Sequence, residues 1–523
     1  MLKDKLIWAD LHNHNEIGYG RGSLERAARL ARERLDIWAF TAHGAWPDLP
    51  QNPEDPAVRK HLAGFAKVRE NWPLVLRSLE AATQPGRFIA LAGFEWHSSK
   101  YGDRHVLAPV SPLQLPGIDI PLTELKAWAE AHEALLIPHH LAYPPASRAV
   151  DWATVDERLS PVAEIFSEHG CSEADDAPWP MDGHSMSPRS TVNCWRTALD
   201  RGLHLGAVAS TDNHEGCPGA YNEGLTGLWV ENFSVAGLFA ALRRRRTFAV
   251  TGDRLVLDWS CLEVPMGETV SLSGRAAGGA GGLQVPLRFW VAGRDAIDCI
   301  DLICNGRLWR RWTPGVDVPE DDGGPGPEFA CGKSGGKEIW LVRGRWGWGR
   351  MGNTAVNHWK AELKVAGGEV LKVEPGFGSV PPEGGADGTC IWSGGPELSW
   401  SSRTSRAYPQ CYDQLLLEVA GDDRTRLELE VECRLDEKVW RRRAICSLGE
   451  LRQHSCEVAM DEPPLTPRFQ WARALPAALC TVAVTEQVVL SGEVASKAES
   501  YIYIRVRQRN GQMAWSSPIW LKP

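Results

Sequence analysis

The chain has 523 residues and a formal net charge of −9, and its apolar and charged fractions, 43% and 24%, are those of a globular protein. This length exceeds what one hydrophobic core supports, so about two or three domains are expected. The sequence contains no basic stripe and no apolar run of membrane-spanning length, which argues against a nucleic-acid-binding or membrane protein. The first residues lack an apolar signal segment, and the 13 cysteines show no Cys-x-x-Cys spacing. A cytoplasmic protein with reduced thiols is therefore expected.

Helical and apolar strand-like segments alternate through the first half of the chain. Helices are predicted after the N-cap Ser23, over 57–82, over 122–133 and up to 198. Seven strands are predicted over 6–9, 35–41, 88–94, 104–107, 134–138, 162–166 and 205–209. This alternation is typical of parallel βα units in a closed or nearly closed barrel of the TIM type, whose site lies at the carboxyl ends of the strands.

The sequence pattern changes at about residue 255. Short, partly alternating runs separated by Gly/Pro-rich stretches predict strands over 256–262, 283–291, 297–303, 339–343, 415–419, 427–433 and 501–507. The predicted organisation is therefore a barrel over 1–254 followed by a β-rich region over 255–523, built as one or two β-sandwich units. The Trp-rich stretch 340–348 could bind a sugar or a partner surface, although tryptophans that pack a sheet face are the commoner case.

The strand-like runs of the first half end in residues that bind metals. The first run leads into Asp10-Leu11-His12-Asn13-His14, and two histidines two positions apart at a strand end point the same way. Thirteen of the 15 histidines lie at or before His214. The candidate ligands are His12, His14, His43, Glu95, His105, His139, Asp212 and His214. Imidazoles mixed with a few carboxylates suit zinc, manganese or iron.

A carboxylate such as Glu95 can bridge two ions. Two ions about 3.5–4 Å apart clamp the attacking and leaving oxygens of a displacement, and a bridging hydroxide serves as the nucleophile. Gly-x-Ser-x-Gly and P-loop patterns are absent from the sequence, so serine-hydrolase and NTPase functions lack support. His61, His132 and His204 are interpreted as structural, and His97 could be either a ligand or a structural residue.

These motifs resemble those of the polymerase and histidinol phosphatase (PHP) superfamily. Asp-Leu-His-Asn-His at 10–14 matches its first motif, and Thr41-Ala42-His43 resembles its Thr-Asp-His. The glutamate of Gly93-Phe94-Glu95, His105, Ile137-Pro138-His139 and the Asp-x-His at 212–214 match the later motifs. Within the superfamily, the segments 164–173, 244–254 and 503–520 are similar to the domain-of-unknown-function family 3604.

The resemblance implies a distorted seven-stranded βα barrel of the PHP type with two or three divalent metals, usually zinc, manganese or iron. By analogy, the first ion would be held by His12, His14, Glu95 and Asp212. Glu95 would bridge to a second ion at His105 and His139, and His43 and His214 would belong to a third position. The sequence departs from the family pattern at Tyr19 and Gly20, where the family usually has a carboxylate or histidine, and at Ala42, where it has an aspartate. Glu16 could substitute as a ligand, or the centre could be binuclear with His43 and His214 left for catalysis.

The leading hypothesis is metal-dependent hydrolysis of a phosphate mono- or diester, with a small anionic ester as the substrate. Arg104 and Arg21 adjoin ligand loops and are the candidates for neutralising developing charge. His140, His169 or His214 could protonate the leaving group. Two alternatives stay open. One is a hydrolase of a sulfate ester, amide or lactone, and the other is a carbohydrate- or partner-binding protein with a vestigial metal site.

Overall fold

The computed structural model describes residues 4–522 except 53, 113, 182–188, 191, 274–282, 317–332, 348–355, 379–386, 406–410, 461–466 and 491–497. Within these described ranges, no helix has both the length and the apolar character needed to cross a membrane. The cysteines in the same ranges are all free thiols.

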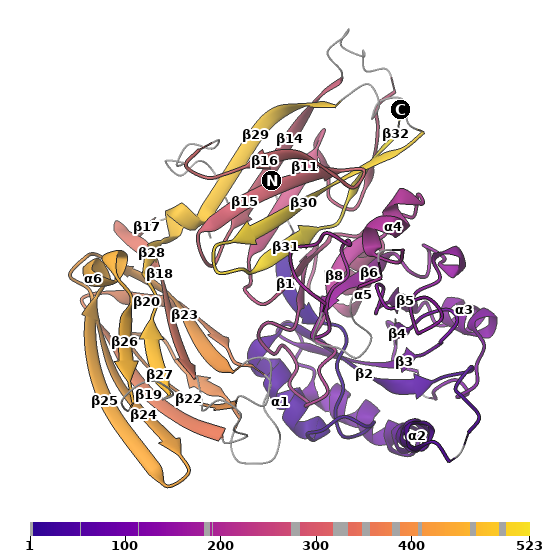
Figure 1. Cartoon of the computed structure of the whole chain (residues 1–523), viewed down its shortest axis with the longest axis horizontal. Coiled ribbons are helices and arrows are strands. Elements are labelled where there is room, and N and C mark those ends of the chain that lie inside the picture. Colours follow the sequence, from indigo (N-terminus) through magenta and orange to yellow (C-terminus); the bar gives the residue numbers. More distant parts are fainter. Residues whose placement is uncertain are drawn as a thin grey trace.

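The first 250 residues form a lobe of helices and strands, coloured indigo to magenta in Figure 1. Every helix and strand predicted for this lobe from the sequence is present. The elements are β1 (Lys5–Asp10), α1 (Leu24–Arg34), β2 (Ile37–Ala45), α2 (Pro56–Ala82), β3 (Ile89–Trp96), β4 (Arg104–Leu107), α3 (Leu122–Ala131), β5 (Leu135–Pro138), η1 (Trp152–Thr154), β6 (Val162–Ser167), β7 (Gly170–Cys171), α4 (Trp195–Asp200), β8 (Gly206–Ala209), β9 (Leu225–Val230), α5 (Val235–Arg243) and β10 (Thr247–Val250).

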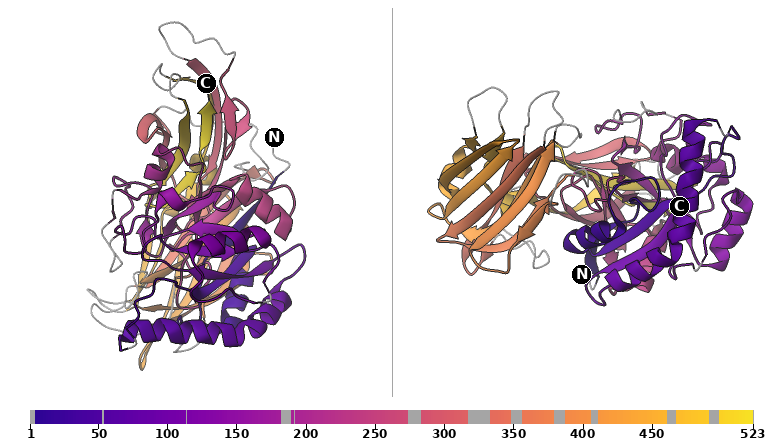
Figure 2. Two further views of the ribbon diagram at one scale, coloured as in Figure 1. Left: turned by 90° about the vertical axis from the view of Figure 1, so that its right-hand side faces the viewer. Right: turned by 90° about the horizontal axis from the view of Figure 1, so that it is seen from below.

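The first two helices begin at well-formed caps. The Ser23 hydroxyl accepts a hydrogen bond from the Arg26 amide at 3.1 Å, which starts α1. The Asp55 carboxylate accepts one from the Ala57 amide at 2.8 Å, and Pro56 opens α2. Both helices bury their apolar faces in a cluster shared with β2 and β3, and Figure 2 shows α2 running along one side of the lobe. The apolar side chains that recur at helical spacing in the sequence therefore pack against the sheet.

The strands of this lobe belong to two hydrogen-bonded sheets. In the larger sheet β1, β2 and β3 are parallel, but β4 and β5 follow as antiparallel neighbours, and β9 and β10 lie antiparallel on the other side of β1. In the smaller sheet β6 pairs with β8 in parallel and with β7 in antiparallel. The strand β5 contacts β6, and β8 contacts β10, without a ladder between the described residues.

The mixed α/β class of the lobe is confirmed, whereas the closed seven-stranded barrel is not. The expectation of parallel pairing is wrong for β4, which pairs antiparallel with both β3 and β5. The strands β9 and β10, which lie outside the seven predicted strands, also pair antiparallel. A short connection joins β3 to β4, and antiparallel neighbours need only such a connection, whereas parallel neighbours need a long crossover.

The large sheet continues beyond residue 254 (Figure 1). The last strands of the chain return to it, because β31 pairs with β10. A four-stranded sheet of β11, β12, β14 and β29 packs beside this extension. The strands are β11 (Val256–Cys261), β12 (Val264–Pro265), β13 (Thr269–Ser271), β14 (Leu283–Ala292), β15 (Ile297–Cys304), β16 (Arg307–Trp312), β29 (Thr481–Leu490), β30 (Ser500–Gln508), β31 (Met513–Ser516) and β32 (Ile519–Lys522). The domain division at 254 stays a prediction.

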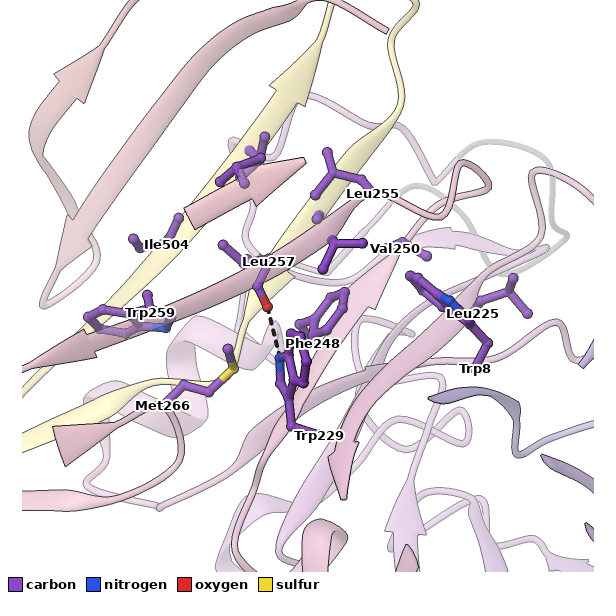
Figure 3. Packing of buried hydrophobic residues seen from close by; sticks show 14 of the residues in the cluster. Trp8, Leu225, Trp229, Phe248, Val250, Leu255, Leu257, Trp259, Met266 and Ile504 are labelled. Atoms are coloured by element: carbon purple, nitrogen blue, oxygen red, sulfur yellow. Dashed lines mark hydrogen bonds between the residues drawn. The ribbon is translucent and has the colours of Figure 1, made fainter. Parts of the chain in front are cut away.

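A shared core joins the first lobe to this β region (Figure 3). Phe248 comes from β10, Trp259 from β11 and Ile504 from β30, and all three are buried in the same cluster. The Trp229 indole donates a hydrogen bond to the Leu257 carbonyl at 3.1 Å across the junction. The first lobe and the returning C-terminal strands therefore stabilise each other.

Residues 333–476 form a separate pair of sheets, drawn in orange in Figures 1 and 2. One sheet has the order β20-β23-β18-β27-β26 with β17 and β28 beside β18, and the other has the order β21-β22-β19-β24-β25. The elements are β17 (Lys333–Ser334), β18 (Lys337–Gly347), β19 (Val356–Ala366), β20 (Glu369–Gly376), β21 (Thr389–Ile391), β22 (Glu397–Ser405), β23 (Tyr412–Gly421), β24 (Arg426–Leu435), β25 (Lys438–Ser447), α6 (Leu448–Gln453), β26 (Cys456–Ala459), β27 (Arg468–Trp471), β28 (Leu475–Pro476) and η4 (Ala477–Cys480).

The Trp-rich stretch supplies the core of this sandwich. Trp340 and Trp346 on β18 are 1% and 0% exposed and pack in one cluster with Trp359 of the opposite sheet. The packing interpretation is confirmed for these two tryptophans, because a buried ring cannot stack on a sugar. Trp348 lies outside the described residues.

Candidate metal centre

The eight predicted ligands come together at one edge of the first lobe. His12 and His14 follow β1, His139 follows β5, and Asp212 and His214 follow β8; His43, Glu95 and His105 lie within β2, β3 and β4. In the ladder, His43 is opposite Glu95, and Glu95 is opposite His105. Because β4 is antiparallel, its second residue reaches the edge at which β2 and β3 end.

The loops after β1 and β8 are tied to each other. The Asp10 carboxylate accepts hydrogen bonds from the Thr211 hydroxyl at 2.7 Å and from the Thr211 amide at 3.1 Å. The Asp212 amide donates to the His12 carbonyl at 2.9 Å. Asp10, the first residue of the Asp-Leu-His-Asn-His motif, therefore holds together the two loops that carry the candidate ligands. Asp212 adopts a positive φ of 53°, which a non-glycine residue accepts only where its surroundings fix it.

Four donors surround the first predicted ion position. The Nε2 atom of His14 lies 3.2 Å from Nε2 of His12 and 3.0 Å from Oδ1 of Asp212. The Nε2 atom of His12 lies 3.5 Å from the same Oδ1, and Oε2 of Glu95 lies 3.6 and 3.5 Å from the His12 and His14 nitrogens. Ligand atoms 2.0–2.2 Å from a tetrahedral zinc ion are about 3.3–3.6 Å apart. The three distances of 3.5–3.6 Å fall in that range, and the two His14 contacts at 3.0 and 3.2 Å are slightly shorter.

The two oxygens of Glu95 face different groups of side chains. Oε2 faces the first position and also lies 3.1 Å from Nε2 of His43. Oε1 lies 2.8 Å from Nε2 of His139 and 3.2 Å from Nδ1 of His97. His105 lies beside His139, with ligand atoms of His12, His105 and His139 within 4.8 Å of one another. Glu95 is therefore placed as a carboxylate that could bridge two ions.

The third predicted position is built from stacked rings. His14 stacks on His43 with ring centroids 4.1 Å apart and planes 24° apart, and on His214 at 4.2 Å and 19°. Tyr19 stacks on the other face of His43 at 3.8 Å. An imidazole nitrogen binds a metal in the plane of its ring. The lone pairs of near-parallel stacked rings lie in separate planes and do not converge on one point in this arrangement. A third ion here stays a prediction.

The ionisation of His14, His105, Glu95 and Asp212 suits metal binding. Burial lowers the pKa of His14 to about 3 and the pKa of His105 well below its usual value. Burial alone would raise the carboxyl pKa values of Glu95 and Asp212, but the surrounding histidines hold both well below the usual range. Neutral imidazoles beside ionised carboxylates are the protonation states that metal ligands require.

Buried polar atoms without hydrogen bonds gather in this cluster. Among the described residues, none donates to or accepts from Nδ1 of His14, Nδ1 of His43, either ring nitrogen of His105 or Nδ1 of His139. A buried polar atom without a partner is costly and calls for an explanation such as a bound ion. The donor set and its burial therefore fit divalent cations of the zinc, manganese and iron type.

Glu164, in the middle of β6, contacts the ring nitrogen of His12 that faces away from the first position. Its carboxylate oxygens lie 3.2 and 3.4 Å from Nδ1 of His12. Burial lowers the pKa of His12, but Asp212 and Glu164 raise it well above its usual value. A proton on Nδ1 that is held by a carboxylate leaves Nε2 of the same ring for a metal.

The three histidines predicted to act in catalysis surround Asp212. The Nε2 atoms of His169 and His140 lie 3.0 and 3.6 Å from its Oδ2. Nδ1 of His214 lies 2.9 Å from its backbone carbonyl oxygen. The structure therefore brings all three beside the first position.

The guanidinium of Arg104 does not reach the cluster, and Arg21 contacts it through its backbone amide, which donates to the His214 carbonyl at 2.7 Å. The Arg104 guanidinium is buried and donates to the carbonyls of Tyr101 and Gly102 at 3.0 and 2.8 Å. Arg21 is half exposed and pairs with Glu215 at 3.5 Å. The prediction that Arg104 is a catalytic residue is corrected on this ground, because its donors are used by the backbone of the neighbouring loop.

Sequence reasoning missed Glu164, Asp103 and Arg148. Arg148 carries the guanidinium that does reach the cluster, with Nη2 2.5 Å from Oδ2 of Asp103 and 3.6 Å from Oε1 of Glu95. A charged residue inside the apolar run 162–166 was the available signal for Glu164. No local pattern marks Asp103 or Arg148, because each comes from a loop and meets the cluster only in the folded chain.

No protein-family model matches the chain. An uncharacterized protein of Chlamydia muridarum is 26% identical over 332 residues, which cover 59% of this chain and 49% of that protein. An uncharacterized protein of Chlamydia pneumoniae is 27% identical over 345 residues, covering 61% and 51%. The chain thus spans about half the length of the curated relatives it matches.

Among solved structures, one match is a two-domain protein of Bacteroides vulgatus that contains a predicted PHP-like metal-dependent phosphoesterase. It has a TM-score of 0.33 and 14% sequence identity, over 60% of this chain and 83% of that chain. A likeness at this level does not assign a family or an activity, so the function is argued from the site itself.

Proposed function

We propose that the chain is a metal-dependent hydrolase of a small anionic ester, with a phosphate mono- or diester as the substrate. The observation that carries the proposal is the set of four buried ligand atoms from His12, His14, Glu95 and Asp212, which lie 3.0–3.6 Å apart, close to the spacing around one tetrahedral ion. Bound zinc, manganese or iron would polarise the ester and supply a nucleophile from water at neutral pH.

The residues around the first position have different roles. Glu95 directs one oxygen to the first position and the other towards His139. Glu164 keeps the His12 ring in one orientation. The cluster is closed by buried neighbours, so a charged substrate group entering it meets fixed dipoles and charges in place of bulk water.

Proton transfer to the leaving group falls to the histidines beside Asp212. His140 and His169 lie next to the first position without belonging to its four donors. His214 is the most open of the three, with 33% of its side chain exposed. A group in this place can deliver a proton to an oxygen that leaves towards solvent.

The proposal is tested with chromogenic phosphate mono- and diesters, sulfate esters, amides and lactones, assayed with chelator and after zinc, manganese or iron is restored. We expect phosphate-ester turnover that chelator lowers by about 100-fold or more and that added metal restores. His12→Ala should show the same loss with metal present. The control His132→Ala, at the exposed end of α3, should stay within about twofold of the wild type.

Two outcomes would overturn the proposal. Turnover that chelator leaves unchanged would remove the metal from the mechanism. Metal-dependent turnover confined to sulfate esters, amides or lactones would keep the site and replace the substrate.

A further inference from the structure

Arg148 is held at the cluster in an unusual backbone conformation. Its φ is 71°, in the left-handed region that non-glycine residues seldom adopt. Its Nη2 atom lies 2.5 Å from Oδ2 of Asp103, 3.0 Å from Nδ1 of His97 and 3.6 Å from Oε1 of Glu95. Strain of this kind persists only where the surroundings fix it, and it concentrates at functional sites.

The loop that carries Arg148 is fastened to the loop between β3 and β4. The Arg148 amide donates to the Ser99 carbonyl, and the Asp103 amide donates to the Arg148 carbonyl. Gly102 allows the two loops to touch, because a Cβ atom there would lie 2.4 Å from Cα of Val150. The guanidinium therefore has a fixed place beside Glu95.

The charge of Arg148 is permanent, and part of its hydrogen-bonding capacity is unused. Burial alone would lower its pKa, but Asp103 and Glu95 raise it above the usual arginine value. The buried Nε atom has no hydrogen-bond partner among the described residues. The side chain is 22% exposed, so the cation is near the surface of the cluster. A buried donor without a partner on a permanent cation is suited to an anion that arrives from outside.

An anion on a metal at Glu95 would come close to this cation. An ion bound to Oε1 of Glu95 would lie about 2 Å from that oxygen, and Nη2 of Arg148 is 3.6 Å from the same oxygen. An oxyanion on such an ion is therefore within reach of the guanidinium. The Arg148 guanidinium contacts the ligand Glu95, whereas the Arg104 guanidinium binds the carbonyls of its own loop and the Arg21 guanidinium pairs with Glu215.

We propose that Arg148, positioned by Asp103, is the substrate-binding residue that selects a group carrying negative charge at the reacting centre. This rests on the proposed function and narrows it: a phosphate ester would bind through Arg148 in addition to the metals, whereas a neutral carboxylic ester or lactone would gain nothing from it. Arginine is suited to this task because its planar donors match phosphate oxygens.

The experiment measures binding of inorganic phosphate to the metal-loaded protein by calorimetry, together with the metal content and the kinetics on a phosphate ester and a neutral ester. Arg148→Met is compared with Arg148→Lys. Arg148 lies over the Trp46 ring at 5.5 Å. The matched control is Arg245→Met, because Arg245 also has a positive φ, 56°, and lies over the Trp520 ring at 5.3 Å. Arg245 donates to the His204 carbonyl and contacts none of the ligands.

We expect Arg148→Met to weaken phosphate binding at least 10-fold and to lower kcat/KM on the phosphate ester at least 100-fold. Metal content and any turnover of the neutral ester should stay unchanged, Arg148→Lys should recover part of the loss, and Arg245→Met should behave as the wild type. Phosphate affinity that is unchanged in Arg148→Met, or metal lost from that variant, would overturn the inference.

The two proposals fail in different ways. Phosphate binding that depends on Arg148 in a protein without ester turnover would support this inference and contradict the proposed activity. Phosphate-ester turnover that Arg148→Met leaves unchanged would support the proposed activity and contradict the inference about Arg148.

Discussion

At the scale of single residues, the site depends on Glu95, whose two oxygens face two groups of histidines. The gathering of the candidate ligands could be predicted from the sequence for all but His105, because each of the others follows or lies near the end of an apolar run, and strand ends of one sheet share an edge. The charged residues around them could not all be predicted. Arg104 adjoins His105 in sequence but points into its own loop, whereas Arg148, far along the chain, reaches Glu95.

Glu164 offers a test at this scale. Glu164→Gln keeps the shape of the side chain but removes the charge that holds Nδ1 of His12. Removal of such a supporting carboxylate is expected to weaken metal affinity by about 10- to 100-fold. The measurement is zinc competition against a chromophoric chelator. Glu124→Gln, in the first turn of α3, is the control and should keep its affinity. Equal affinities in the two variants would reduce Glu164 to a packing role.

At the scale of elements, apolar runs and caps predicted where helices and strands lie, while strand pairing escaped prediction. The Ser23 cap and the runs that became β1 to β6 and β8 were readable because these signals are local. Pairing is a property of distant segments. The sequence of β4 does not show that it runs antiparallel to β3, although this direction brings His105 opposite Glu95. For the same reason, the pairing of β31 with β10 could not be predicted from the sequence.

At the scale of the whole molecule, buried ion pairs join the sandwich of residues 333–476 to the rest of the chain. Arg343 of β18 binds Asp253 through two hydrogen bonds of 3.0 and 2.9 Å. Glu374 of β20 lies 3.1 Å from Nε of Arg294, which precedes β15. Removing one partner of a buried ion pair lowers the free energy of unfolding by more than a surface ion pair contributes to it. The relative placement of the two parts is therefore sensitive to these contacts.

The Glu374 contact gives a pH-dependent prediction. Burial alone would raise the carboxyl pKa, but Arg294 and Lys372 lower it from 4.5 to about 2. A depressed pKa contributes stability that is complete above the unfolded value and is lost as the pH falls towards the folded value. The free energy of unfolding should therefore lose about 2–3 kcal/mol from this group between about pH 6 and pH 2.5.

Glu374→Gln should remove that part of the pH dependence, as measured by urea unfolding of the metal-free protein at the two pH values. Glu369→Gln, exposed on the same strand, is the control. A variant whose unfolding free energy falls with pH as steeply as that of the wild type would show that the Arg294 contact contributes nothing to stability.

The most direct test of the account is the number of metal ions bound per chain, measured by inductively coupled plasma mass spectrometry after dialysis against zinc or manganese. The account predicts at least two ions per wild-type chain, and the loss of at least one in His12→Ala and in Asp212→Ala. The control His132→Ala should keep the full number. Less than one ion per wild-type chain, or an unchanged number in both ligand variants, would contradict the central claim that these buried side chains form a metal centre.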